Sequence, residues 1–590
     1  MEPTGAREMI ISFKKRLIFL SVVILLLLNH SYAFCQNNSD KIIIQDSIIK
    51  KVRDAYVDTI SSSTLLDGAI EGLIGKLDPH SSYMPPTAAG EFKEKIRGDF
   101  DGIGITFAMI DGKITIIEVV EGGPSEGLGL KARDKIIKIG KDSAVGISQE
   151  EVKNRLRGPK DSTVTVVVER SGEEKLLTFK IKRDKININS VSHAYMVDER
   201  TGYIALSRFT EKSHTEVKIA LQKLQAQGMR RLVFDLRNNS GGLLEVSVNI
   251  VRFFINQGLI VETRGSRSSD NKQYRANGRA QFADLPMIVL INHGSASASE
   301  IVAGALQDHD RALIVGQTSF GKGLVMNEFP LTADTGDRRR KYLGSLILSV
   351  AHYYTPSGRL IQRPFDKGKE NYIREGFDNI DPNAADSSKA ENPVYYTDLR
   401  RKVYGGGGIT PDKEVALLLK LNKLERAIRK TNLCFEFADV YLMLHEDIPE
   451  KFEEFLTNYR IPQEEMMRFK EFIVENGITI EAEPSFNEEL EELVAKHDLS
   501  EESVEIIKKS LTETNIEYNK TLFDKSIDFI ERELKQEIAR MVWGPVERFI
   551  VWHTNDTELM EALSYFDEAE VLLKRRIAMG KVNQETSQLE

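Results

Sequence analysis

The chain has 590 residues, several times the usual size of one domain, so more than one hydrophobic core is expected. Hydrophobic residues make up 41% and charged residues 29% of the sequence, which is globular usage and excludes a mainly disordered or fibrous chain. Acidic residues outnumber Lys and Arg by 89 to 80, so we expect no nucleic-acid partner. The two cysteines, Cys35 and Cys434, are too few and too far apart for a disulfide framework or a cysteine zinc site.

The N-terminus has the pattern of an export signal. Three basic residues at 14–16 precede an apolar run over residues 17–28, and a small-residue cleavage site follows at 31–33. We therefore expect residues 1–33 to be a signal peptide and the protein to be exported to the periplasm or the envelope. Two alternatives stay open: an uncleaved signal that anchors the chain in the membrane, and lipidation at Cys35, which the bulky residue before it disfavours.

The rest of the chain divides into four segments by pattern. Residues 34–87 show apolar residues at helical spacing and predict an N-terminal helical segment. Residues 88–184 alternate short β runs with glycine turns, which predicts a small β-rich domain. Residues 185–412 alternate strands and helices, as α/β layered domains do. Residues 413–590 are amphipathic, rich in Glu and Lys, and predict a helical C-terminal extension.

The α/β segment is specific enough to place individual elements. Strands are predicted at 202–209, 231–236, 286–292 and 312–317, and helices at 213–227, 243–256 and 297–308.

Three serines lie at a strand-to-helix junction in the segment NHGSASASE, residues 292–300. A serine there lies at a helix N-terminus, where unpaired backbone N–H groups and the positive end of the helix dipole can stabilise an oxyanion. On the residues alone, the alternative that these serines are only helix caps stays open.

Two further segments end strands with glycine-containing turns. In TSFGKGLV, residues 318–325, Lys322 lies between two glycines. A lysine acts as a general base only when it is neutral, which requires burial to lower its pKa from about 10.4; the alternative is a solvated surface lysine. In FDLRNNSGG, residues 234–242, free N–H groups of the turn could complete an oxyanion hole.

These three segments, with LDPHSSY at 77–83 and YTPSGR at 354–359, resemble the carboxy-terminal processing protease family over roughly residues 45–412. The resemblance implies that the β-rich insert is a PDZ domain and that the α/β segment has a crotonase-like fold. We therefore expect an α/β multidomain protein: a crotonase-like α/β protease core with an inserted PDZ domain, N-terminal helices and a C-terminal helical extension.

By position, the same resemblance implies the roles of individual residues. Ser297 corresponds to the nucleophile and Lys322 to the general base of a Ser–Lys dyad. The backbone N–H groups of Ala298 and of Gly241 or Gly242 correspond to the oxyanion hole. The implied activity is that of a serine endopeptidase that works through an acyl-enzyme, with no metal or cofactor.

One departure from the family pattern bears on activity. The family usually has a glutamine four residues after the lysine, and Met326 stands there in this chain; a thioether cannot hold the amine firmly. Asn327 and Gln362 are the candidates to replace it. A Ser–His arrangement with His293 or His309 lacks a matched acid, so both histidines are interpreted as packing or surface residues. A catalytically weakened PDZ scaffold that binds an adaptor is therefore the alternative function.

The segment from Phe100 to Phe107 resembles the carboxylate-binding loop and strand of a PDZ domain, where backbone N–H groups receive a peptide C-terminus. The residues expected to bind it are Gly102, Ile103, Gly104 and Ile105. Protein or peptide substrates with exposed, mostly apolar C-termini are therefore predicted. The C-terminal extension shows no catalytic spacing, and we expect it to serve oligomerisation or substrate caging ahead of adaptor binding.

Overall fold

A computed structural model describes residues 40–334, 340–366, 368–378, 392–415, 421–478, 523 and 526–587. The predicted signal peptide and Cys35 lie outside these ranges. The chain forms two compact units, the first comprising the N-terminal part up to Pro85 together with Glu328–Leu348, and the second comprising the remainder. Within the described ranges, no helix is both long enough and apolar enough to cross a membrane.

The first unit contains the two predicted N-terminal helices and residues Glu328–Leu348 of a long β-hairpin. The helices span residues 40–55 and Ser62–Ile74 (α2), and the Ser61 hydroxyl caps α2 by accepting the Thr64 N–H. The hairpin comes from β17 (Leu324–Asp334) and β18 (Arg340–Tyr354), and β1 (Ser82–Met84) pairs antiparallel with β18. The sequence pattern did not predict this association of residues 328–348 with the N-terminal segment.

The predicted β-rich domain is built on a small β-sheet and includes two α-helices. Its sheet has the order β3-β4-β5-β7-β8, with β6 on β5, and a separate pair β2–β9 joins the two ends of the insert. The elements are α3 (Pro86–Arg97), β2 (Asp99–Gly102), β3 (Ile105–Ile110), β4 (Lys113–Val119), η1 (Glu126–Leu128), β5 (Lys135–Ile139), β6 (Asp142–Ser143), α4 (Gln149–Leu156), β7 (Thr163–Glu169), β8 (Leu177–Lys182) and β9 (Asp184–Asn187). Within the described residues β3 pairs only with β4, so its other edge is open.

The α/β domain is built on a six-stranded sheet of order β10-β11-β12-β15-β16-β21. All neighbours run parallel except β10, which is antiparallel to β11. The strands are β10 (Val191–Met196), β11 (Thr201–Leu206), β12 (Arg231–Asp235), β15 (Met287–Ile291), β16 (Leu313–Gly316) and β21 (Lys413–Glu414). Every residue of β15 is buried, as expected for a strand covered on both faces.

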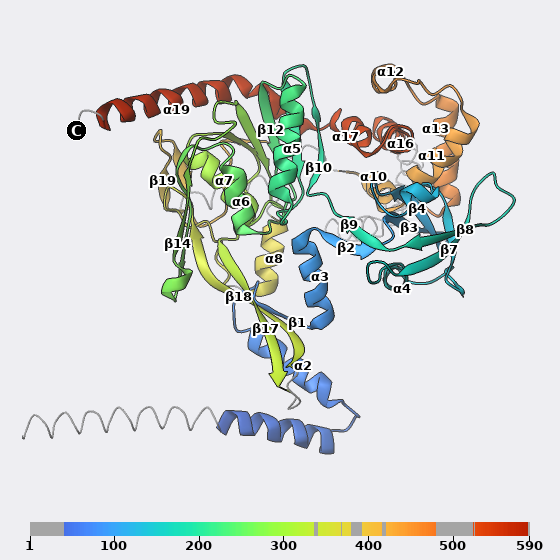
Figure 1. The fold of residues 1–590 in the computed structure, drawn as a ribbon, viewed down its shortest axis with the longest axis horizontal. Coiled ribbons are helices and arrows are strands. Elements are labelled where there is room, and N and C mark those ends of the chain that lie inside the picture. The colour runs from blue at the N-terminus through green and yellow to red at the C-terminus, as the bar shows by residue number, and fades with distance from the viewer. Residues whose placement is uncertain are drawn as a thin grey trace, which may run out of the picture. The chain divides into compact units, whose positions relative to one another are not determined.

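The two faces of this sheet are covered by helices from different parts of the chain. Met287, Val289 and Ile291 of β15 pack in a core with α5 (Ser213–Ala226), α6 (Leu244–Val251) and α7 (Ala298–Asp308). Ile288 and Leu290 point the other way, since successive side chains of a strand alternate. They pack in a core with residues of α18 (Thr557–Ser564) and α19 (Phe566–Ser587), which α17 (Pro545–His553) precedes. Figure 1 labels α5, α6, α7, α17 and α19.

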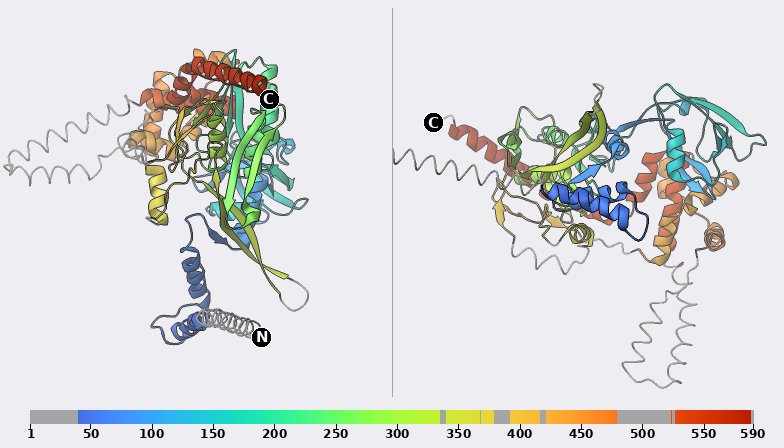
Figure 2. Two further views of the ribbon diagram at one scale, coloured as in Figure 1. Left: turned by 90° about the vertical axis from the view of Figure 1, so that its left-hand side faces the viewer. Right: turned by 90° about the horizontal axis from the view of Figure 1, so that it is seen from below.

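Part of the predicted C-terminal extension therefore belongs to the α/β domain. Residues 545–587 supply a helical layer of the protease core, and β21, just past the expected boundary at residue 412, is a strand of its sheet. The remaining C-terminal helices, α10 (Lys423–Lys430), α11 (Leu433–Leu444), α12 (Phe452–Thr457), α13 (Gln463–Glu475) and α16 (Ile527–Val542), surround a core of their own. They lie beside the β-rich domain in Figures 1 and 2. Arg133 of that domain forms an ion pair with Asp439 of α11.

Smaller elements complete the second unit. They are β13 (Gln257–Gly265), η2 (Ser268–Asp270), β14 (Lys272–Asn277), α8 (Lys369–Asp378), β19 (Val394–Tyr396) and β20 (Lys402–Tyr404).

The predicted helix at 243–256 ends earlier, at Val251. The chain there tightens into turns with Phe253 N–H bonded to Ile250 C=O and Phe254 N–H to Val251 C=O, which keeps both rings in the core while the helix ends.

Candidate active site

Three turns follow the carboxyl ends of β12, β15 and β16, which are adjacent in the sheet. Parallel strands bring such turns to one edge, where ligands bind in open α/β sheets. The turn after β12 carries residues 236–242, the turn after β15 carries 292–297, and the loop after β16 carries 317–323. The three segments singled out in the sequence therefore meet at one place.

The three serines differ in burial and bonding. Ser295 is buried, and its hydroxyl donates to Leu236 C=O at 2.8 Å. Ser299 is also buried and donates to Asn239 C=O at 2.8 Å. Ser297 is half-buried. The hydroxyls of Ser295 and Ser299 thus connect the segment that carries the serines to the turn after β12. Ser297 is the one of the three serines that solvent reaches.

The backbone of Ser297 has φ 55° and ψ −112°, a region that residues other than glycine rarely adopt. Its N–H donates to Oε2 of Glu300 at 2.7 Å, and its C=O accepts the hydroxyl of Tyr353 at 3.1 Å. Tyr353 is fully buried, and burial raises the pKa of its hydroxyl far above the usual value, so it remains a donor. Two buried groups therefore hold the strained turn in place.

Glu300 is a buried carboxylate that organises both the serine turn and the lysine loop. Its Oε1 accepts the Ser319 hydroxyl at 2.6 Å and the Gly321 N–H at 2.7 Å. Its Oε2 accepts the N–H of Lys322 at 2.9 Å in addition to that of Ser297. Burial raises the pKa of Glu300, whereas these four donors favour its charged form. One side chain thus fixes the backbone of both predicted dyad residues.

Lys322 is half-buried, in a loop that the surrounding chain approaches closely. Gly323 donates its N–H to Oε1 of Gln362 at 2.8 Å, and a Cβ on Gly323 would lie 2.9 Å from the backbone nitrogen of Gln362. The amide NH2 of Gln362 donates to Arg363 C=O and to the Tyr372 hydroxyl. Gln362, one of the two candidates to replace the missing glutamine, therefore supports the backbone of the lysine loop.

The other residues near the lysine lie on β17. Met326 is half-buried and shares a strand face with Leu324, because alternate residues point the same way. Asn327 is exposed and lies on the opposite face.

The glycine turn after β12 lies against the serine. Gly241 has φ +102°, and a Cβ there would lie 2.8 Å from Ser297 Cβ and 3.0 Å from Ala298 N. The Gly241 N–H donates to Asn239 Oδ1 at 2.9 Å. In the part of the chain that is described, neither the Gly242 N–H nor the Ala298 N–H has an acceptor. The hydrogen bonding therefore favours Gly242 over Gly241 as the second donor of an oxyanion hole.

The histidines were the alternative partners for the serine. His309 follows the last residue of α7, and Ser297 precedes the first, so about 16 Å of helix separates them. Both ring nitrogens of His309 are bound, to Asp398 at 2.8 Å and to Leu259 C=O at 2.6 Å. These contacts favour the packing interpretation of His309. His293 is half-buried in the serine turn.

The loop predicted to bind a peptide C-terminus leads into the open edge of β3. Gly104 has φ +75°, and a Cβ there would lie 3.2 Å from Gly123 Cα. Ile103 is buried, and its C=O accepts the Ser125 hydroxyl at 2.5 Å. The Val120 N–H donates to Gly104 C=O, so Ile105 does not bond β4 and its N–H points to the open edge.

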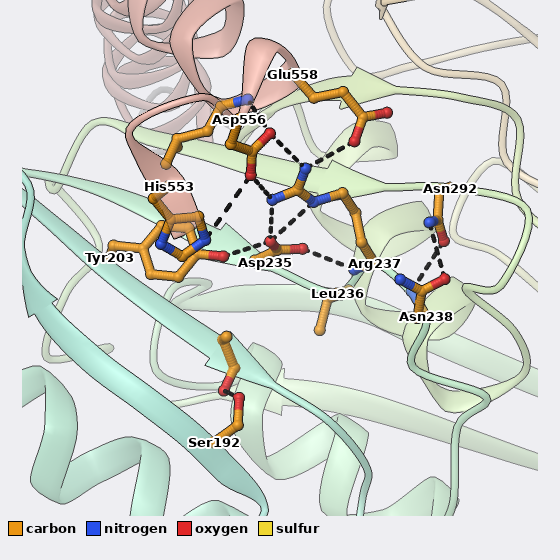
Figure 3. A network of polar contacts seen from close by, with 12 residues as sticks. Ser192, Tyr203, Asp235, Leu236, Arg237, Asn238, Asn292, His553, Asp556 and Glu558 are labelled. Atoms are coloured by element: carbon orange, nitrogen blue, oxygen red, sulfur yellow. Dashed lines mark hydrogen bonds and ion pairs between the residues drawn. The ribbon is translucent and has the colours of Figure 1, made fainter. Parts of the chain in front are cut away.

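Several residues that shape the site were not identified from the sequence. Glu300 had a local signal, because Ser297 and Glu300 have the spacing of a capping box. Asp556 and Glu558 had none: they lie more than 300 residues from the turn after β12, yet both bind Arg237 in that turn, as Figure 3 shows. Across the described residues, no cluster of three or more metal-binding side chains occurs.

Family models match three parts of the chain. The model for peptidase family S41 matches residues 200–368, and a PDZ domain model matches residues 102–182. A model described as a probable PDZ-protease C-terminal helical domain matches residues 424–566. Together with the fold, these matches define a serine-type peptidase: an α/β protease core with an inserted PDZ domain and a C-terminal helical domain.

Relatives narrow this class further. The chain is 38% identical to a carboxy-terminal-processing protease of Bartonella bacilliformis, over 55% of this chain and 74% of that protein. It is 35% identical to the carboxy-terminal processing protease CtpB of Bacillus subtilis, over 56% and 68%. The chain belongs to the carboxy-terminal processing protease family. A solved structure, the photosystem II D1 C-terminal processing protease, is 24% identical and covers 65% of this chain and 89% of its own, with a TM-score of 0.32.

Proposed function

We propose that this peptidase cleaves peptide bonds with Ser297 as the nucleophile and Lys322 as the general base. The observation that carries the proposal is the shared carboxylate oxygen of Glu300, which accepts the backbone N–H of both residues. Ser297 is also the serine of the three that is only half-buried. A nucleophile and its base have to be held in a fixed relation, and a common buried anchor provides it.

The reaction follows from these positions. Neutral Lys322 takes the proton of the Ser297 hydroxyl as Oγ bonds to the carbonyl carbon of the substrate. The N–H groups of Ala298 and Gly242 donate to the oxyanion that forms. Collapse of the tetrahedral intermediate breaks the C–N bond, and the leaving amine takes the proton from Lys322. The Lys322 amine then deprotonates a water that attacks the ester carbon; the bond to Ser297 Oγ breaks, and Oγ takes the proton back from Lys322.

The proposed substrates are envelope or secreted proteins that expose an apolar C-terminus. The C-terminal carboxylate would be received by N–H groups of the loop Gly102–Ile105, and the peptide would extend the sheet along the open edge of β3. The basic and apolar pattern of residues 14–28 supports export to the periplasm or envelope.

The test is gel-based cleavage of an unfolded protein with an apolar C-terminus between pH 6 and pH 9. Wild type, Ser297→Ala and Lys322→Ala are compared, with Ser299→Ala, in the first turn of α7, as the control for loss of a nearby buried hydroxyl. We expect both dyad variants to lose activity by at least a thousandfold, and wild-type activity to rise with pH as the lysine becomes neutral. Undiminished cleavage by Ser297→Ala would contradict the assignment.

Met326 favours one second candidate, a weakened enzyme that acts mainly as a PDZ scaffold for an adaptor. It predicts that Ser297→Ala binds a C-terminal peptide as tightly as wild type and that wild-type turnover is near background. Met326→Gln distinguishes the two functions. A gain of tenfold or more would mean that a missing amide limits the dyad, and an unchanged high rate would mean that other groups already orient the lysine.

A further inference from the structure

The guanidinium of Arg237 joins the turn after β12 to the start of α18. It donates from Nε and Nη2 to Oδ2 of Asp235, the last residue of β12, at 2.9 and 2.7 Å. It also donates from Nη2 and Nη1 to the two carboxylate oxygens of Asp556, at 2.6 and 3.0 Å. All three side chains are at most 7% exposed. Figure 3 shows this arrangement, with the guanidinium between the two carboxylates.

Glu558 connects the same arginine to a second turn of the site. Its Oε2 accepts Arg237 Nη1 at 2.7 Å, and its Oε1 accepts Gln317 Nε2 at 2.9 Å. Gln317 begins the loop after β16 that leads to Lys322. The strand β15, which leads to Ser297, lies between β12 and β16 in the sheet. One carboxylate of α18 therefore spans the strand of the nucleophile and holds the turns on either side of it.

The start of α18 is itself fixed. Asp556 caps the helix by accepting the Leu559 N–H at 3.0 Å, while its oxygens also receive Arg237. Leu559 is buried in the core between α18 and the sheet. Burial opposes the charge of both acids; it raises the pKa of Glu558, while the ion pair with Arg237 outweighs it at Asp556 and lowers that pKa. Hydrogen bonds to the Asp556 and Glu558 carboxylates therefore fix the positions of the groups that donate to them.

The turn that Arg237 belongs to reaches the serine through direct contacts. Two residues further on, Asn239 accepts the Ala296 N–H at 3.0 Å through its C=O, and its side chain accepts the Gly241 N–H. Gly241 packs against Ser297 Cβ. A shift of Arg237 would therefore displace the glycines beside the nucleophile.

We propose that Glu558 is a positioning residue. By binding Arg237 and Gln317 together, it sets the spacing between the turn after β12 and the loop after β16 that carries Lys322. The catalytic consequence rests on the proposed function of Ser297 and Lys322. The C-terminal layer of the protease core thereby becomes part of the machinery of the site, although none of its residues touches the reacting atoms.

The test is Glu558→Gln in the full chain. A carboxylate accepts from both partners, whereas an amide accepts on one side only, so one of the two bonds to Arg237 and Gln317 is lost. We expect kcat to fall about tenfold to a hundredfold with KM within about twofold, and amide hydrogen exchange to quicken in residues 236–242 and 317–323. Asp567→Asn, an exposed acid of α19, is the matched control and should change neither.

Rescue separates positioning from general stability. In the double variant Glu558→Gln, Gln317→Glu, the amide oxygen at 558 accepts from Arg237 and the amide NH2 donates to the new carboxylate at 317, with the net charge unchanged. We expect kcat to recover to within about threefold of wild type and exchange in both turns to slow again. A single variant that lowers Tm and quickens exchange throughout the core, without rescue, would overturn the proposal.

The exchange measurement does not depend on turnover. If wild type cleaves and Glu558→Gln leaves kcat and exchange unchanged, the positioning role is wrong and the proposed function stands. If wild type does not cleave and exchange in Glu558→Gln still quickens in the two turns, the positioning role of Glu558 is correct and the proposed function is wrong.

Discussion

The backbone N–H groups of Ser297 and Lys322, 25 residues apart in the sequence, donate to the same oxygen atom, Oε2 of Glu300. The distances are 2.7 and 2.9 Å, and the carboxylate is fully buried. The relation between the two residues is thus set at the backbone, and only the side-chain rotamers remain to be ordered. In the proposed mechanism, this shared anchor is how a chain without the usual glutamine after its lysine holds the dyad.

Glu300→Gln is expected to lower kcat by about a hundredfold. An amide has one acceptor atom and adds two donors, so at least one of the four groups that donate to the carboxylate is left facing a donor. Leaving such a group unsatisfied costs about 1–3 kcal/mol. Steady-state kinetics and thermal unfolding measure both effects. Full activity with an unchanged Tm would show that the shared oxygen is not needed.

Two serines of the turn, Ser297 and Ser295, should respond differently to replacement by alanine. Ser297→Ala is expected to abolish cleavage with little change in Tm. Ser295→Ala removes a buried hydroxyl that accepts the Asn292 N–H and donates to Leu236 C=O, so stability should fall by about 1–3 kcal/mol while cleavage persists. Activity assays and thermal scans on the same preparations check this. If Ser295→Ala lost cleavage activity without losing stability, the assignment of Ser297 as the nucleophile would be wrong.

Gly241→Ala is expected to reduce activity at least a hundredfold. The new Cβ would lie 2.8 Å from Ser297 Cβ, closer than carbon atoms approach, so the serine turn or the glycine turn has to move. Gly228→Ala is the matched control, because its φ of +101° equals that of Gly241 within a degree and its nearest neighbour is 3.8 Å away. Both should lose stability through backbone strain, about 1–2 kcal/mol, and only Gly241→Ala should lose activity. Equal activities would contradict the close packing.

Stability is expected to fall as the pH is lowered from 6.5 toward 4, in part through His193. Burial, with the nearby His553, lowers the pKa of His193 to about 3, whereas an unfolded histidine has a pKa near 6.5. In that window the unfolded chain binds a proton that the folded chain does not, so protonation favours unfolding, by up to about 1.4 kcal/mol per pH unit. His193→Phe keeps the stacking on Phe549 and cannot be protonated.

Thermal unfolding between pH 7 and pH 5 measures this difference. The Tm of His193→Phe should fall less steeply with acid than that of wild type. His553, with a pKa lowered to about 4 by burial, keeps contributing in both proteins, so some dependence remains. Parallel curves would mean that folding does not change the pKa of His193.

The α/β elements could be placed from the sequence because their signals are local. The apolar run at Met287–Ile291 and the turn residues that follow it predicted β15 and the start of α7 to within a residue or two. Helix ends were less certain: the apolar pattern continued past Val251, although the chain there leaves the helix in tight turns. Periodicity reports which side chains are buried, and burial continues through a turn.

The family, the order of the strands and helices along the chain, and the three turns with their serine, lysine and glycines could all be predicted from the amino-acid sequence. These depend on residues close together in the chain or on motif order. The three-dimensional contacts were needed to show that one oxygen of Glu300 anchors both Ser297 and Lys322. They were also needed to show that the Gly241 N–H is bonded while that of Gly242 has no acceptor among the described residues. The tertiary structure also brought Glu558 to Arg237, 321 residues away in the sequence, because the C-terminal helices cover the second face of the sheet. Such contacts depend on how distant apolar surfaces pack, which no local pattern of residues encodes.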